Sequence, residues 1–317
     1  MSSMAEGKKR LFTGLQPSGQ LHIGNYFGAL KPFVELYGGY ESFLCAVDYH
    51  ALTTIRNPKQ LSQNIQQIVG DYIAAGVNPS RAVIFKQSDV SAHTELAWIF
   101  NCLVTVSFLE LGHAYKDAAG KGKEATAGLF TYPTLMAADI VLYDTDIVPV
   151  GEDQRQHLEY TREIAAKFNN TFGQTFKEPK EYILKEVAVV PGTDGRKMSK
   201  SYGNTIPLFG TKDEIAKAVM SIVTDSAGER PENVYAIHKL LKAEDELAPL
   251  YTKNAGNYKV LKEALIEDLE TLIAPMREKR LAISDADVAK VLAEGGEKAR
   301  TIADKKMETV RQKIGVR

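Results

Sequence analysis

Cysteine is scarce in this chain, and its scarcity narrows the range of protein classes. The 317 residues include only two cysteines, Cys45 and Cys102, which lie far apart in apolar surroundings. They form no spaced cluster with histidine, so neither a zinc nor an iron–sulfur site is expected, and a disulfide-rich secreted fold is excluded. We therefore expect two buried thiols in the core and a protein of the reducing cytoplasm.

Long apolar runs and a surplus of one charge are also missing. No run is long enough to span a bilayer, and the first ten residues have no apolar core, so neither a membrane segment nor a signal peptide is expected. The formal net charge is −1, so nucleic acid binding would need a local basic patch. With 44% hydrophobic residues, the chain can form one large or two ordinary globular domains.

The most informative stretch is the turn formed by residues 16–25, QPSGQLHIGN. It follows a strand-like run, Arg10–Leu15, and precedes the start of a helix at Tyr26. Free backbone N–H groups and the positive end of a helix dipole can bind phosphate at such a turn. His22 can donate a hydrogen bond to a phosphate oxygen. A Pro-Ser-Gly turn alone is more often an ordinary connection between a strand and a helix.

A second stretch, Lys197–Ser201, changes that balance. It begins 175 residues after His22 in a glycine-rich loop, and its sequence is KMSKS. Two lysines in such a loop would by themselves indicate only a solvated basic surface. The two stretches together resemble the HIGH and KMSKS elements of the class I aminoacyl-tRNA synthetases, in the same order and with a fitting separation. Asn25 stands where the first element usually has histidine.

Fold class follows from the alternation of short apolar runs with amphipathic segments, which predicts a Rossmann-like doubly wound parallel sheet. Ligands of such sheets bind beyond the carboxyl ends of the strands. We expect a catalytic domain at residues 1–205, with a connecting insertion at about 112–145, and a helical domain at 206–317. Expected strands are Ser42–Asp48, Arg81–Phe85 and Asp146–Gly151, and expected helices are Lys59–Ala75, Ala92–Leu111, Ile215–Val223, Ala286–Leu292 and Glu297–Val316.

Asp139 draws attention because it lies in an apolar helical segment, Met136–Tyr143. A carboxylate there is costly unless it finds a partner, which can be an arginine, a helix end or a donor on a ligand. The runs Met136–Asp139, Gly151–Gln154 with His157, and Val47–His50 extend the resemblance to the tryptophan-specific members of the class. In that context Asp139 would accept the indole N–H.

The resemblance implies residue roles and partners. It implies catalytic roles for His22, Lys197 and Lys200. For ATP it implies Gln16, Pro17, Ser18, Gly24, Asn25, Gly151, Glu152, Asp153, Val190, Lys197, Met198, Ser199, Lys200 and Ser201. For L-tryptophan it implies Asp139, Met136, Tyr132, Gln154, Phe12, His50, Val148 and Val150. It also implies Mg²⁺ bound with ATP, recognition of the tRNA(Trp) anticodon by the helical domain, a last helix that packs back on the catalytic domain, and a homodimer.

Several alternatives remain open from the sequence. The basic segment Lys116–Lys123 can be a surface loop or a lid, and Lys116, Lys121 and Lys123 compete for the role of phosphate ligand. Met136, Val148 and Val150 would be plain core residues outside the motif context. The tyrosine enzyme of the same class shares both nucleotide elements. A non-catalytic relative that binds RNA or regulates is a third candidate, although it would have no need for two aimed ammonium groups.

Overall fold

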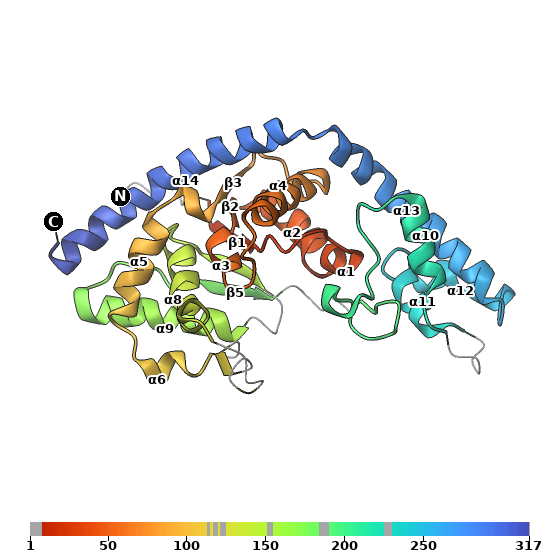
Figure 1. Cartoon of the computed structure of the whole chain (residues 1–317), viewed down its shortest axis with the longest axis horizontal. Helices are drawn as coiled ribbons and strands as arrows, with labels where there is room; N and C mark the ends of the chain where they lie inside the picture. The colour runs from red at the N-terminus through yellow and green to blue at the C-terminus, as the bar shows by residue number, and fades with distance from the viewer. Residues whose placement is uncertain are drawn as a thin grey trace, which may run out of the picture.

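A five-stranded sheet forms the centre of the molecule (Figure 1). The computed structural model describes residues 8–112, 115–116, 120, 125–150, 155–183, 190–224 and 230–316. All four strand pairs are parallel, in the order β3-β2-β1-β4-β5, which confirms the predicted doubly wound sheet. The order reverses between β1 and β4, and such a point opens a crevice for a ligand. The strands are β1 (Arg10–Leu15), β2 (Glu41–Ala46), β3 (Ala82–Lys86), β4 (Ile147–Val150) and β5 (Lys180–Ile183).

Both faces of the sheet are buried, as parallel sheets require. Alternate residues of β1 show this, since Leu11 and Leu15 belong to one hydrophobic cluster and Phe12 belongs to another. Residues from helices before and after Ile206 belong to these two clusters. The helices and helical turns before Ile206 come first in the chain. They are α1 (Ile23–Asn25), a π-helix (Tyr26–Leu30), α2 (Lys31–Leu36), η2 (Tyr37–Gly39), α3 (Asp48–Ala51), α4 (Pro58–Ala74), η3 (Gln87–Asp89), α5 (Ala92–Asn101), α6 (Val106–Leu109), α8 (Ala127–Val141), α9 (Arg155–Phe172) and η5 (Lys200–Tyr202).

The described part of the chain after Ile206 contains helices and no strand of the sheet. Reciprocal capping boxes start α10 at Thr211 and α14 at Ser284. Apolar packing continues from the sheet into this part, because one cluster holds both Leu11 and Leu265. The division at residue 205 therefore stays a prediction. The helices are α10 (Lys212–Met220), α11 (Glu232–His238), α12 (Glu244–Lys253), α13 (Tyr258–Ala282) and α14 (Asp285–Ile314).

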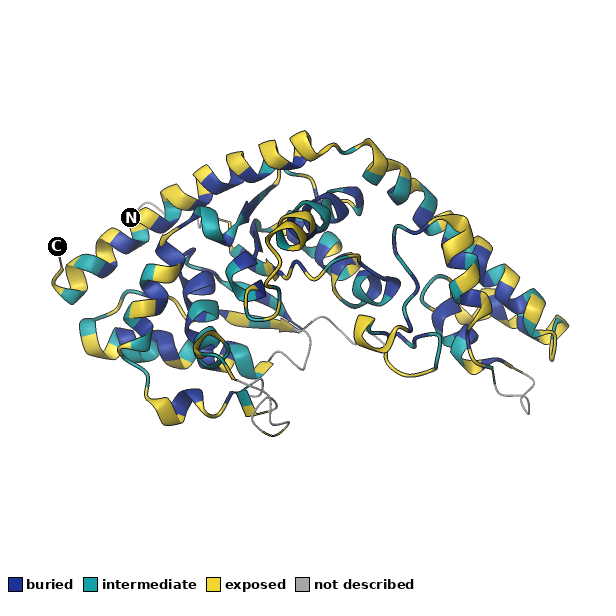
Figure 2. Ribbon diagram, in the orientation of Figure 1, coloured by how far each residue is buried: buried dark blue, intermediate teal, exposed yellow. Residues whose placement is uncertain are grey.

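Helix α14 crosses back over the first half of the chain (Figure 1). The two helices expected at Ala286–Leu292 and Glu297–Val316 are one continuous helix, because Gly295 and Gly296 lie inside it rather than between two helices. Its buried residues recur every three or four positions, and its outer face is exposed along its length (Figure 2). A Cβ on Gly295 would lie 1.8 Å from the carbonyl oxygen of Ile84. The helix thus rests directly on the backbone of β3.

Two expectations around α5 are wrong. The helix expected at Ala92–Leu111 ends at Asn101, and a short helix, α6, follows. Thr105 explains the break, since its hydroxyl caps the N–H of Phe108 and starts a new helix. Cys102 at the end of α5 is exposed, whereas Cys45 is buried as expected.

Candidate active site

The first motif is held by a reciprocal cap between His22 and Asn25. The N–H of Asn25 donates to Nδ1 of His22 at 3.3 Å, and the N–H of His22 donates to Oδ1 of Asn25 at 3.1 Å. Burial, followed by the nearby Lys200 ammonium, lowers the pKa of His22 from 6.5 to about 4. The ring is therefore neutral at pH 7 and carries its proton on Nε2. Asparagine fits the fourth position of the motif because it completes this cap.

Two backbone N–H groups at the start of the helix are not free, although the sequence predicted free N–H groups at this turn. The Ile23 N–H donates to the carbonyl of Ile206 at 3.0 Å, and the Asn25 N–H is used in the cap. The expectation is therefore wrong for these two groups.

The second motif is packed against the first. The Lys200 ammonium donates to the carbonyl oxygens of Ser18 and Gly19, each at 3.0 Å. Gly24 lets the motifs approach, since a Cβ there would lie 2.8 Å from Nδ1 of His22 and 3.3 Å from Cβ of Met198. Residues 182 positions apart thus form one local structure, although Lys197 and Lys200 both remain exposed.

Asn204 organises the loop that carries the second motif, and sequence reasoning missed it. Its Oδ1 accepts from the N–H of Ser199 at 2.8 Å, and its Nδ2 donates to Asp194 at 2.6 Å. Val190 also holds the second motif, because its carbonyl accepts from the N–H of Met198 at 2.9 Å. Both Val190 and Met198 are buried. An asparagine in a loop carries no local signal of this role, because its partners are defined only by the folded loop.

A cavity of about 580 Å³ lies where β1 and β4 meet helix α8. Gln16 and Thr13 also line it, so the cavity reaches the first motif. It brings together seven of the eight residues predicted for tryptophan. Phe12, His50, Tyr132, Met136, Asp139, Val148 and Val150 all line it. His157 also lines it, and its Nε2 lies 2.7 Å from the Tyr132 hydroxyl.

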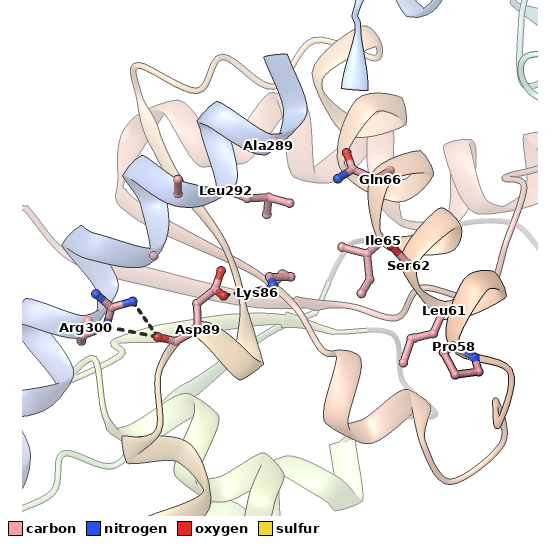
Figure 3. Close-up of a pocket in the computed structure, with 12 residues that line it drawn as sticks. Pro58, Leu61, Ser62, Ile65, Gln66, Lys86, Asp89, Ala289, Leu292 and Arg300 are labelled. Carbon is pink, nitrogen blue, oxygen red and sulfur yellow. Dashed lines mark hydrogen bonds and ion pairs between the residues drawn. The ribbon is translucent and has the colours of Figure 1, made fainter. Parts of the chain in front are cut away.

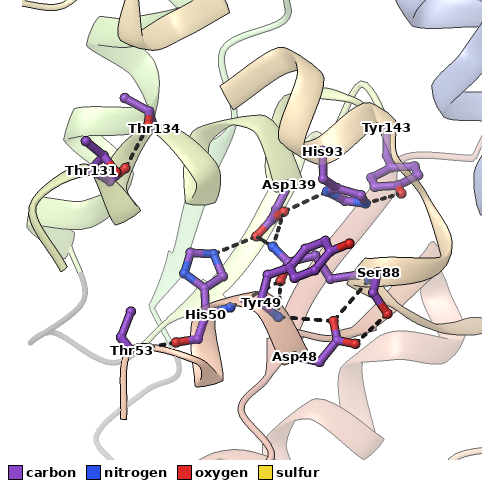
Figure 4. A network of polar contacts seen from close by, with 11 residues as sticks. Asp48, Tyr49, His50, Thr53, Ser88, His93, Thr131, Thr134, Asp139 and Tyr143 are labelled. Carbon is purple, nitrogen blue, oxygen red and sulfur yellow. Dashed lines mark hydrogen bonds and ion pairs between the residues drawn. The ribbon is translucent and has the colours of Figure 1, made fainter. Parts of the chain in front are cut away.

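Asp139 is only 2% exposed, and side chains from three elements surround its carboxylate (Figure 4). Oδ2 lies 2.9 Å from Nε2 of His50, and Oδ1 lies 2.6 Å from Nδ1 of His93. Gln87 donates from Nε2 to both oxygens, at 2.7 and 2.9 Å. Burial alone would raise the pKa of Asp139, but the contacts with His50 and His93 outweigh it and lower the pKa to about 2. The site thus holds an ionised, buried acceptor.

Some predicted site residues lie outside the described part of the chain. These are Gly151, Glu152, Asp153 and Gln154, together with Lys121 and Lys123. Lys116 is described and exposed. The choice among the three lysines therefore stays open.

A second cavity, of about 620 Å³, lies between α4 and α14 (Figure 3). None of the predicted site residues lines it. Its charged groups interact with one another, since Lys86 lies 3.0 Å from Asp89 and Arg300 donates to the Asp89 carbonyl.

The described residues contain neither a cluster of metal-binding side chains nor a membrane-spanning helix. No group of three or more His, Cys, Asp or Glu is placed to hold a metal ion. No helix there combines the length and the apolar character needed to cross a membrane.

Comparison with known proteins agrees with this geometry. The family described as tRNA synthetases class I (W and Y) matches residues 4–295, and the chain belongs to this family. The tryptophan–tRNA ligase of Fusobacterium nucleatum is 47% identical over 97% of this chain and 98% of its own length. The crystal structure of a Campylobacter jejuni tryptophanyl-tRNA synthetase complexed with ADP and tryptophan superposes with a TM-score of 0.91 at 42% identity, covering 96% of this chain and 99% of that one.

The tyrosine branch of the family is more distant among these matches. A tyrosyl-tRNA synthetase from Archaeoglobus fulgidus, complexed with tyrosine, has a TM-score of 0.67 at 18% identity, over 87% of this chain and 91% of that one. This likeness shows the fold alone.

Proposed function

We propose that this enzyme uses ATP to attach L-tryptophan to tRNA(Trp). The tryptophan carboxylate attacks the α-phosphorus of ATP, which forms tryptophanyl adenylate and releases pyrophosphate. A terminal hydroxyl of the tRNA then attacks the carbonyl carbon, and AMP leaves. The observation that carries this proposal is an apolar cavity with one ionised acceptor, placed beside the joined first and second motifs.

The cavity suits indole better than phenol. Indole offers one N–H donor and no acceptor, and an ionised carboxylate such as Asp139 can only accept. Phe12, Met136, Val148 and Val150 supply the apolar walls. We assign the α-amino group of the substrate to Tyr132 and Gln154, with His50 close to the ring. Tyrosine would leave the space of the second ring empty, and phenylalanine would in addition offer no donor to Asp139.

We assign the ATP phosphates to the joined motifs. His22 is neutral and presents an Nε2 donor, and Lys197 and Lys200 can neutralise charge as it builds on pyrophosphate. Phosphoryl transfer needs positioning and charge neutralisation more than covalent help, and these groups supply both. The remaining nucleotide contacts are assigned to Gln16, Pro17, Ser18, Gly24, Asn25, Gly151, Glu152, Asp153, Val190, Met198, Ser199 and Ser201.

Mg²⁺ would accompany ATP and further neutralise the phosphates. Such a metal keeps mostly water and phosphate oxygens as its ligands, so it needs no dedicated protein cage.

We assign recognition of the tRNA anticodon to the helical part of the chain after Ile206. We also assign the protein to the cytoplasm. The cysteines support the cytoplasm, because Cys45 and Cys102 are both free thiols. A homodimer is supported by an apolar surface around α5. Trp98 is 70% exposed there, and Ile99, Leu103, Phe172 and Ile314 lie around a shared hollow.

The activity is tested by ATP–pyrophosphate exchange with tryptophan, tyrosine or phenylalanine. We expect kcat/KM for tryptophan to exceed the others by roughly several hundredfold, from one polar and one cavity effect. Asp139→Ala should narrow this ratio mainly by weakening tryptophan. A preference for tyrosine would place the chain with the tyrosine enzymes, and no exchange at all would favour a non-catalytic module.

A further inference from the structure

The two oxygens of the Asp139 carboxylate face different surroundings, one toward the cavity and one away from it. Its Oδ2 faces His50, which lines the cavity. Its Oδ1 faces His93, which is fully buried on α5 and does not line the cavity (Figure 4). The 2.6 Å contact between Nδ1 of His93 and Oδ1 is the shortest that Asp139 makes with either histidine. A group that never meets the ligand therefore makes close contact with the acceptor.

Gln87 has its amide orientation fixed by the backbone. Its Oε1 accepts from the N–H groups of Tyr49 and His50, at 3.1 and 3.4 Å. Only Nε2 is then left to donate to Asp139, which matches the contacts to both oxygens. Gln87 thus joins α3 to the carboxylate and carries no freedom to flip.

The proton positions of His93 follow in the same way. An ionised carboxylate only accepts, so Nδ1 of His93 must carry a proton. The other nitrogen, Nε2, lies 2.8 Å from the hydroxyl of Tyr143, which is fully buried. Where Nε2 carries no proton, the Tyr143 O–H donates to it. The chain Tyr143–His93–Asp139 then has every proton assigned, and the ring is also packed against Phe85 with a centroid separation of 6.0 Å.

We propose that His93 is a positioning residue for tryptophan selection. The Nδ1–H of His93 donates to Oδ1 on the side of the carboxylate away from the cavity. Gln87 donates to both oxygens and so fixes the plane of the carboxylate. Together these two residues keep Oδ2 oriented toward the cavity. His50 then covers Oδ2 in the free protein, and the indole N–H joins or replaces it there. This inference rests on the proposed function, in which Asp139 accepts the indole N–H.

Two substitutions at His93 separate a positioning role from a packing role. The amide nitrogen of asparagine can occupy the place of Nδ1, whereas that of glutamine reaches the place of Nε2. We expect His93→Gln to raise the KM for tryptophan and to narrow the tryptophan/tyrosine ratio of kcat/KM by roughly tenfold to a hundredfold, as for the loss of a hydrogen bond to a charged group. His93→Asn should stay within a few fold of wild type. The KM for ATP should not change in either variant.

The reverse pattern would overturn the proposal: a His93→Gln enzyme as selective as wild type, or equal losses in both variants. The Asp139→Ala variant separates a failure of the proposed function from a failure of the role proposed for His93. If Asp139→Ala keeps wild-type selectivity, the proposed function of Asp139 fails, whereas if only His93→Gln keeps it, the role of His93 alone fails. Wild-type protein labelled with ¹⁵N-histidine offers a measurement that does not depend on the folding of any variant. We expect His93 to carry a proton on Nδ1, and protonation at Nε2 alone would contradict the proposal.

Discussion

At the residue scale, Lys200 offers the sharpest test of the nucleotide assignment. Its ammonium group is exposed and donates to backbone oxygens of the first motif. We expect Lys200→Ala to slow tryptophan-dependent exchange by roughly 100- to 1,000-fold, the usual loss for removing one aimed electrostatic donor. The KM for tryptophan should barely change, because the lysine acts on the pyrophosphate side.

Lys212→Ala is a matched control for this change. Lys212 is also an exposed lysine, but it lies on α10 and pairs with Glu267 at 2.8 Å. Its loss should leave exchange unaffected. A rise in the KM for tryptophan with an unchanged rate in Lys200→Ala would mean that the loop serves the amino acid instead.

Residues differ in how far the sequence can predict them. Asp139 was predictable, because an acidic residue in an apolar helix signals an unusual environment. His93, Gln87 and Asn204 were not, since each is defined by partners distant in the sequence or fixed only by a folded loop. Gln87 and Asp139, for example, are 52 positions apart. No local pattern records such a pairing, and a histidine near the start of an apolar helix is most simply interpreted as part of the core.

At the scale of elements, the close contact between α14 and β3 gives a second prediction. We expect Gly295→Ala to destabilise the protein by about 1–3 kcal/mol or more, because the new Cβ would lie 1.8 Å from the Ile84 carbonyl oxygen and must push the helix outward. Gly296→Ala is the matched control. Its new Cβ would lie 3.3 Å from Cβ of Asp89, a contact that a shift of a few tenths of an ångström relieves. That variant should be neutral or gain up to about 1 kcal/mol from helix propensity. Urea unfolding of both variants checks the difference.

Equal stability of the two alanine variants would contradict this close packing. The same pair of glycines shows why elements were only partly predictable. Apolar runs located the strands of the first half, and helical spacing located α10 and α14 to within three residues of their starts. Two adjacent glycines suggested a helix break, but the packing of α14 on β3 requires a residue without a side chain at this point. Tertiary contact therefore decided the helix length against local propensity.

At the scale of the whole molecule, long-range ion pairs join the two ends of the chain. Arg280 of α13 donates to Asp71 of α4 at 2.9 Å, and Arg311 of α14 donates to Glu95 of α5 at 2.7 Å. Burial raises the pKa of Asp71 to about 6, although Arg280 opposes this shift. The helices after Ile206 therefore support the sheet directly. The resemblance implied that the last helix packs on the first half, but neither of these two ion pairs was predicted from the sequence.

The last prediction concerns the apolar surface around α5, defined by Trp98, Ile99, Leu103, Phe172 and Ile314. It surrounds a hollow of about 710 Å³, and exposed apolar patches of this kind mark sites of association. Tryptophan is among the residues that most often dominate such interfaces. We expect light scattering of the wild type at micromolar concentration to give twice the chain mass of 34.9 kDa, and Trp98→Arg to give the single chain mass.

Leu281→Arg is the control for this experiment. Leu281 is 82% exposed near the end of α13, away from α5, so its replacement should leave the dimer intact. A Trp98→Arg protein that remains dimeric would place the interface elsewhere, and a monomeric wild type would remove the homodimer altogether. Because Trp98 and His50 both line a smaller hollow beside α8, loss of the dimer should also weaken tryptophan-dependent exchange in Trp98→Arg but not in Leu281→Arg.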